Sequence, residues 1–220
     1  MATKTPRIKI CCISSLEEAR MAVEFGAAAL GLVGHMPSGP GVISDDLIAT
    51  IARSAPPAVA TFLLTSETDA GAVITHQQKV STSTVQIVDA LATGTYADIR
   101  AALPGIKLVQ VIHVTDEASV DEASRIAPEV DALLLDSGNP ALAVKELGGT
   151  GRTHDWSLSR RIVESVKAPV FLAGGLRPEN VREAIGTVGP FGLDLCSGVR
   201  TNGQLDPFKL EKFFEAVAQA

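Results

Sequence analysis

The segment GGTGRTHDWS, residues 148–157, has the residue types that point most directly to chemistry. Within six positions it holds three glycines, the basic Arg152 and two threonines. Gly149 and Gly151 allow backbone conformations closed to other residues, so several backbone amides can turn toward one anion. We therefore expect an anion-holding loop at the start of a helix, although a glycine-rich turn taken alone is more often a tight corner.

Two further glycine-containing loops follow apolar runs later in the chain. Gly174 and Gly175 end the run VFLAGG, and Ser197 and Gly198 follow the run LDLC. These glycines can simply turn the chain. Because three loops share the feature, we prefer the interpretation that their backbone amides together surround a phosphate.

Two reactive side chains, Cys11 and Asp136, stand at the ends of apolar runs. Side chains alternate along a strand, so Cys11 shares a face with Lys9, whereas Cys12 lies on the opposite face and is expected to be packing. A buried cysteine is often a small apolar filler, but a neighbouring lysine favours the thiolate, which can act as a base. Asp136 follows three leucines and either caps a helix or donates a proton, if its surroundings raise its pKa.

Eight short apolar runs alternate with amphipathic segments, and these elements must position the residues above. The runs are IKICC, ALGLVG, VATFLL, TVQIV, KLVQVI, DALLLD, VFLAGG and GLDLCSG. Most of the segments between them have apolar residues at spacings of three and four, which is typical of helices. Eight such units, without a GxGxxG motif after the first strand, predict an α/β fold: a (β/α)8 TIM barrel in a single domain covering residues 1–220.

The barrel makes its first and last strands neighbours, which brings Lys9 and Asp194 onto adjacent inward faces. A buried lysine and aspartate would not remain unpaired, so we predict an ion pair between them. Helix starts are expected at Ser14 or Ser15, at Ser44, at Thr153 or Asp155, and with Pro178 in a first turn. The helix between residues 65 and 83 has the weakest pattern. The irregular loop of residues 35–41 is expected to cover one barrel mouth.

Composition limits the possible functions. A net charge of -6 and a pI near 5.2 argue against a general binder of nucleic acid or anionic membranes. No window approaches the roughly 20 apolar residues of a membrane span, and no signal peptide is evident, so we expect a cytoplasmic protein. Three cysteines suit a reducing compartment, and the four scattered histidines show no ligand spacing, so no metal site is expected.

The chain resembles the phosphoribosylanthranilate isomerase family over nearly its whole length. IKICCIS is similar to the family's KICGIT, GGTGRTHDWS to GGTGKTFDWS, FLAGGLRPENV to LAGGLNPENV, and LDLCSGVR to VDVSSGVE. The resemblance implies an enzyme of tryptophan biosynthesis that performs a cofactor-independent Amadori rearrangement of a phosphoribosyl amine. It implies Cys11 as general base at C2 of the sugar and Asp136 as general acid at the ring oxygen.

The expected partner is a small phosphorylated sugar, and a monomer and a homodimer are both compatible with the sequence. The residues expected to contact the substrate or its phosphate are Lys9, Gln86, Gly149, Gly151, Arg152, Gly174, Gly175, Asp194, Ser197, Gly198 and Arg200.

The chain departs from the family pattern at the end that should hold the anthranilate. Cys12 replaces a glycine, Gly41 or a neighbour replaces an arginine, Val88 replaces a histidine, and Arg200 replaces a glutamate. Gln86 is retained.

Three readings remain open at this point. Arg200, Arg152 or His35 could take over recognition of the anthranilate carboxylate. The chain could instead be an isomerase or epimerase acting on another sugar phosphate. It could also be a non-catalytic barrel that binds a phosphorylated metabolite.

Overall fold

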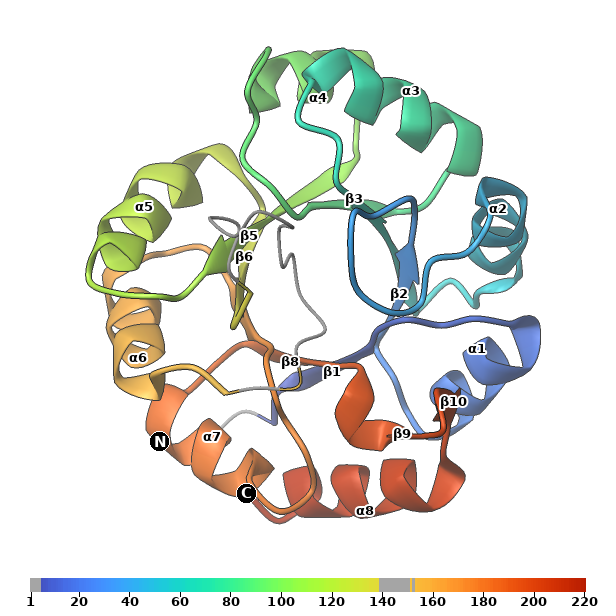
Figure 1. The fold of residues 1–220 in the computed structure, drawn as a ribbon, viewed down its shortest axis with the longest axis vertical. Helices are drawn as coiled ribbons and strands as arrows, with labels where there is room; N and C mark the ends of the chain where they lie inside the picture. The colour runs from blue at the N-terminus through green and yellow to red at the C-terminus, as the bar shows by residue number, and fades with distance from the viewer. Residues whose placement is uncertain (1–4, 139–150, 152) are drawn as a thin grey trace.

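Eight parallel strands close into a barrel surrounded by helices, as Figure 1 shows. The computed structural model of the chain describes residues 5–138, 151 and 153–220. The barrel strands are β1 (Arg7–Ile10), β2 (Ala29–Val33), β3 (Ala60–Thr65), β4 (Thr84–Ile87), β5 (Lys107–His113), β6 (Ala132–Asp136), β7 (Val170–Leu172) and β8 (Gly192–Leu195). The predicted (β/α)8 barrel is therefore confirmed.

Helices follow the strands around the outside of the barrel. They are α1 (Leu16–Glu24), α2 (Asp45–Ser54), α3 (Ala70–Val80), α4 (Tyr96–Ala102), α5 (Ala118–Ile126), α6 (Trp156–Ser165), α7 (Val181–Val188) and α8 (Pro207–Ala218), with a short 3-10 helix η1 (Ala127–Glu129) after α5. None of the helices within the described residues combines the length and apolar character that a membrane crossing requires.

Local sequence signals account for most helix starts. The side chains of Ser15, Ser44 and Asp155 each accept a backbone amide of the first turn, as expected. The weakly patterned segment does form a helix, α3, which Asp69 caps. The expectation for Pro178 is wrong because α7 begins only at Val181.

The strand register brings β1 and β8 together and closes the barrel. Lys9 lies opposite Asp194, and Ile10 lies opposite Leu195. Parallel strands place all their carboxyl ends at the same mouth. Residues that follow β1 and β8 in the sequence therefore meet there, although more than 180 positions separate them.

Alternation along the strands sorts the side chains into two apolar layers. Ile10 belongs to the layer between strands and helices, whereas Cys11 belongs to the cluster inside the barrel. On β6, Ala132 and Leu134 lie inside the barrel, so Asp136 at the strand end faces the interior as well.

A small hairpin that the sequence did not reveal follows the last barrel strand. After the 3-10 helix η2 (Ser197–Val199), β9 (Arg200–Thr201) pairs antiparallel with β10 (Gln204–Leu205). Figure 1 shows the hairpin between α1 and α8. Strands of two residues are too short to produce a hydrophobic period, so pattern analysis could not find them.

Candidate active site

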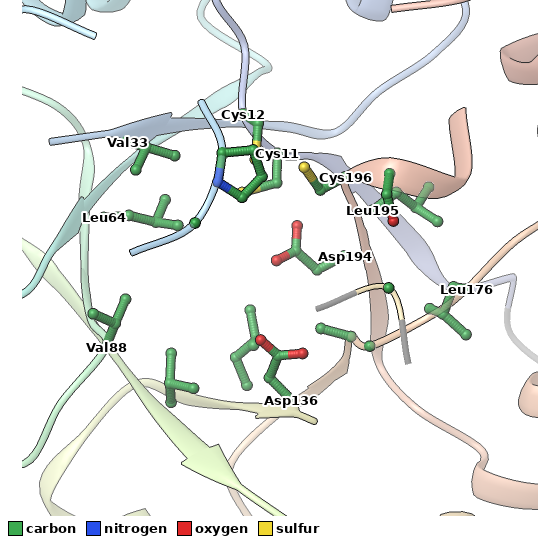
Figure 2. A pocket seen from close by; sticks show the side chains of 18 of the residues that line it. Cys11, Cys12, Val33, Leu64, Val88, Asp136, Leu176, Asp194, Leu195 and Cys196 are labelled. Carbon is green, nitrogen blue, oxygen red and sulfur yellow. The ribbon is translucent and has the colours of Figure 1, made fainter. Parts of the chain in front are cut away.

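A cavity opens at the carboxyl-end mouth of the barrel. It is lined by residues that lie on, or directly follow, each of the eight strands, and Figure 2 shows side chains of this lining. The irregular loop contributes Met36, Ser38, Gly39 and Pro40. That loop therefore covers the mouth as expected.

The two proposed reactive groups lie on opposite sides of this cavity. Figure 2 shows Cys11 on the β1 side and Asp136 on the β6 side, with the carboxyl group of Asp194 between them. The backbone amide of Cys11 donates to the carbonyl of Leu195 at 2.7 Å, which ties the residue to β8. A small ligand that fills the cavity can therefore touch both the thiol and the carboxyl group.

Burial controls the acidity of Asp136. Only 7% of its surface is exposed, and this burial raises the pKa of Asp136 above its ordinary value. The amide of Ser137, which donates to Oδ1 at 2.8 Å, and the nearby His113 counteract part of the effect, while Asp194 adds to it. A carboxyl group in this environment keeps its proton more readily than an ordinary aspartate does, as a general acid must.

Lys9 and Asp194 form the predicted ion pair beneath the cavity. Lys9 Nζ lies 2.9 Å from Asp194 Oδ2, and the lysine side chain is fully buried. Burial opposes the charge on Lys9, but the carboxylate of Asp194 outweighs it, so the pKa of Lys9 is raised. Nζ also lies 5.2 Å from the ring centre of Phe62. Asp194 lines the cavity but Lys9 does not, so the expectation that Lys9 contacts the substrate is wrong, and its charge is used to hold Asp194.

Cys12 lines the cavity, so the expectation that it packs on the outer face is wrong. Its backbone has a φ of 61°, in the left-handed region that glycine favours, and this turn ends the alternation of β1. Hydrogen bonds with the thiols of Cys11 and Cys196, together with burial, raise the pKa of Cys12 well above its ordinary value. Cys12 is therefore a neutral thiol beside Cys11.

The loop that covers the mouth packs directly against Cys12. A Cβ atom added to Gly41 would lie 2.5 Å from the Cβ of Cys12, and Gly41 itself has a φ of 86°. No side chain fits at position 41 while residue 12 carries one. Gly41 and Cys12 therefore constrain each other's size at the mouth of the barrel.

Arg200 requires a correction. Its side chain is only 8% exposed, bonds Glu18 and backbone carbonyl groups, and does not line the cavity. The expectation that Arg200 contacts the substrate is therefore wrong, because its guanidinium is already engaged behind β1. His35 is exposed and is not among the lining residues either.

The residues of the expected phosphate site come together at one end of the cavity. The described members that line it are Gly151, Gly174, Gly175, Ser197 and Gly198. A Cβ on Gly198 would lie 2.0 Å from the carbonyl oxygen of Leu176, so only glycine fits there. Gly149 and Arg152 lie outside the described residues.

A second hollow shares these loops and adds positive charge to the same end. Arg177, Lys209 and Lys212 line it together with Glu179. Sequence analysis missed these residues. The lysines lie on α8 and the arginine follows β7, so only the closed barrel brings them together.

The wall of the cavity at β4 contains the polar side chain of Gln86 and the apolar side chain of Val88. Gln86 is buried, and its Oε1 has no hydrogen-bond partner within the described residues. Val88 is also buried, and its carbonyl oxygen lies 3.0 Å from Nε2 of His113, a residue the sequence analysis did not select. No cluster of histidine, cysteine or acidic residues in the described part of the chain could hold a metal ion.

Comparison with known proteins agrees with this geometry. The family model for N-(5'-phosphoribosyl)anthranilate (PRA) isomerase matches residues 8–216. The chain belongs to this family. N-(5'-phosphoribosyl)anthranilate isomerase 2 of Methanosarcina mazei is 37% identical over 209 residues, which cover 94% of this chain and 92% of the relative. The PRA isomerase family is an enzyme family, so the chain is an aldose–ketose isomerase, and its family places it in tryptophan biosynthesis.

Solved structures of PRA isomerases share the fold. A crystal structure of phosphoribosyl anthranilate isomerase in complex with reduced 1-(O-carboxyphenylamino)-1-deoxyribulose 5-phosphate has a TM-score of 0.77 and 27% identity. A structure of monomers generated from the dimeric isomerase of Thermotoga maritima has a TM-score of 0.78 and 26% identity. Each comparison covers 98% of this chain and all of the solved chain.

Proposed function

We propose that the chain converts N-(5'-phosphoribosyl)anthranilate into the 1-deoxyribulose phosphate product, with Asp136 as general acid and Cys11 as general base. The observation that carries the proposal is the placement of Cys11 and Asp136 on opposite sides of one cavity whose end is a glycine-lined loop cluster. Family membership supplies the substrate class.

The first step requires a proton donor at the ring oxygen of the ribose. Asp136 transfers its proton to that oxygen, the bond between C1 and the ring oxygen breaks, and the amine nitrogen supplies the electrons that form an iminium. The buried carboxyl group of Asp136 suits this step because its raised pKa keeps the proton available.

The second step requires a base at C2. The thiolate of Cys11 removes the C2 proton, and its electrons flow into the iminium to give an enolamine. The enolamine becomes the keto amine when a proton leaves the C2 hydroxyl and another is added at C1. Lys9 lies on the same face of β1 as Cys11 and holds the carboxylate of Asp194 in place beside the cavity.

The rest of the cavity orients the substrate. Backbone amides around Gly175, Ser197 and Gly198 would hold the phosphate, and this remote contact supplies binding energy and orientation. Gln86 presents to a sugar hydroxyl an acceptor oxygen that has no hydrogen-bond partner among the described residues. The ligand is thus a phosphorylated small molecule, as in the solved complex named above.

The activity is tested directly with pure protein and freshly generated phosphoribosylanthranilate, followed by the fluorescence of the substrate. We expect turnover by the parent chain, and a fall in kcat of about 10²–10⁴-fold for Asp136→Asn and for Cys11→Ser. Asp121→Asn, an exposed aspartate on α5, is the matched control and should keep full activity. Binding of ribose phosphates without turnover by the parent would favour another sugar-phosphate substrate and overturn the proposal.

A further inference from the structure

Behind the cavity, Glu18 of α1 and Arg200 of β9 form a nearly buried ion pair. Arg200 Nη1 lies 2.8 Å from Glu18 Oε1, and Nη2 lies 3.0 Å from Oε2, so both carboxylate oxygens are engaged. The two side chains are 8% and 10% exposed. Such a two-pronged contact fixes the plane of the guanidinium as well as its position.

Backbone groups around the pair hold it further in place. Glu18 also accepts the amides of Ser14 at 2.9 Å and of Leu205 at 2.8 Å. Nη1 of Arg200 donates to the carbonyl of Gly203 at 2.9 Å, and Lys209 donates to the carbonyl of Arg200 at 2.6 Å. The guanidinium is therefore tied to α1 and to the hairpin, and the backbone of Arg200 is tied to α8.

Besides its bond to Glu18, Nη2 of this guanidinium reaches the backbone of the proposed base. Nη2 of Arg200 donates to the carbonyl of Cys12 at 2.6 Å and approaches the carbonyl of Cys11 at 3.3 Å. These two carbonyls flank the left-handed residue that turns the chain at the end of β1. A cysteine rarely adopts this conformation without support from the surrounding structure.

We propose that Arg200, aligned by Glu18, is a positioning residue that holds the left-handed turn at Cys12 and thereby aims the Cys11 thiol into the cavity. The proposal rests on the proposed role of Cys11 as base. Arg200 does not touch the substrate and acts only through the backbone of residues 11 and 12.

The residue types at the two positions support this assignment, because Cys12 and Arg200 meet in one hydrogen bond. Glycine adopts a positive φ at little cost, whereas cysteine needs its carbonyl group held. A glutamate could not donate to that carbonyl, and the guanidinium can.

The test is a double-mutant cycle between residues 200 and 12, read by steady-state kinetics with phosphoribosylanthranilate. In the parent background, Arg200→Met should lower kcat at least tenfold while KM changes less than threefold, because the phosphate loops are untouched. In a Cys12→Gly background the same replacement should lower kcat less than threefold. The rate at which iodoacetamide alkylates Cys11, measured by mass spectrometry, should change in parallel with kcat.

Two further variants separate positioning from loss of the fold. Arg200→Met alone leaves the buried carboxylate of Glu18 without a partner and can unfold the chain for that reason. Adding Glu18→Met removes this charge, so the double variant should fold, but its kcat should stay as low as that of Arg200→Met. Arg161→Met, which breaks the exposed pair with Glu117, is the control and should retain parent activity.

The possible outcomes are distinct. Equal losses of kcat in the cysteine and glycine backgrounds, or a folded Arg200→Met chain with kcat within twofold of the parent, would overturn the positioning role. Full activity of Cys11→Ser would instead overturn the proposed function, whatever the cycle shows.

Discussion

The buried ion pair between Lys9 and Asp194 makes a quantitative prediction about stability. At a separation of 2.9 Å and an effective dielectric constant near 20, two unit charges attract by about 6 kcal/mol. Removing both ions from water consumes much of this attraction, so the intact pair adds little net stability. Replacing Lys9 with methionine leaves the carboxylate of Asp194 buried without a partner. We expect the free energy of unfolding to fall by about 3–5 kcal/mol, which lowers Tm by roughly 10 °C for a chain of this length.

Urea and thermal unfolding at pH 7, followed by circular dichroism, measure this loss. Asp194→Asn added to Lys9→Met removes the stranded charge and should recover most of the stability. Lys79→Met is the matched control, because Lys79 lies 2.8 Å from Asp45 but is 62% exposed. That change should cost less than about 1 kcal/mol. The reasoning is refuted if Lys9→Met and Lys79→Met cost the same, because burial would then not determine the effect.

Three further predictions follow from the charges around the cavity. Burial raises the pKa of Asp136 in the folded chain, so ionisation of this carboxyl group opposes folding increasingly as pH rises above about 4. Asp136→Asn should therefore have a higher Tm than the parent at pH 7, and the difference in Tm should shrink toward pH 4. For Glu18, burial raises the pKa, but bonds from Arg200 and from backbone amides outweigh it and lower the folded value below 4.5. The stability that the ionised Glu18 contributes is then complete above pH 4.5 and is lost as the pH falls through the pKa of Glu18 in the folded chain. The amount by which the Tm of Glu18→Gln lies below that of the parent should therefore decrease below pH 4.5. Lys212→Glu reverses a charge beside the phosphate loops and should raise KM a few-fold at low salt, an effect that 0.5 M salt should abolish.

A specific outcome would contradict each of these three predictions. A Tm advantage of Asp136→Asn that grows toward pH 4 would mean that the carboxyl group is not held protonated by burial. A deficit of Glu18→Gln that is constant from pH 7 to pH 3 would exclude the ionised carboxylate as its source. A KM change for Lys212→Glu that persists at high salt would indicate a structural effect instead of a long-range charge.

Local patterns in the sequence were sufficient to predict the barrel and the positions of some of the residues at its mouth. The spacing of apolar residues separates strands from helices, and alternation along a strand decides which side chains face inward. Those two regularities, with the closure of a parallel barrel, predicted that Lys9 meets Asp194, and the ion pair is found.

The failures all occur where a regular pattern stops. Alternation placed Cys12 outside, but a single positive φ turned it into the cavity. Arg200 was expected to contact the substrate because its loop follows the glycines, but Glu18, 182 positions earlier, holds its guanidinium.

The sequence by itself determined the order of strands and helices, the identity of the thiol and the carboxyl group, and the strand ends that carry them. These features depend on neighbours in the chain, whose spacing repeats regularly. Only the tertiary structure decided that three thiols lie together in one wall of the cavity and that Gly41 packs against Cys12 with no room for a side chain. It also decided that the buried Arg200 donates a hydrogen bond to the backbone of the turn at Cys12. Such contacts join segments far apart in sequence, and their geometry is set by the closure of the barrel and by individual backbone torsions, which no local periodicity encodes.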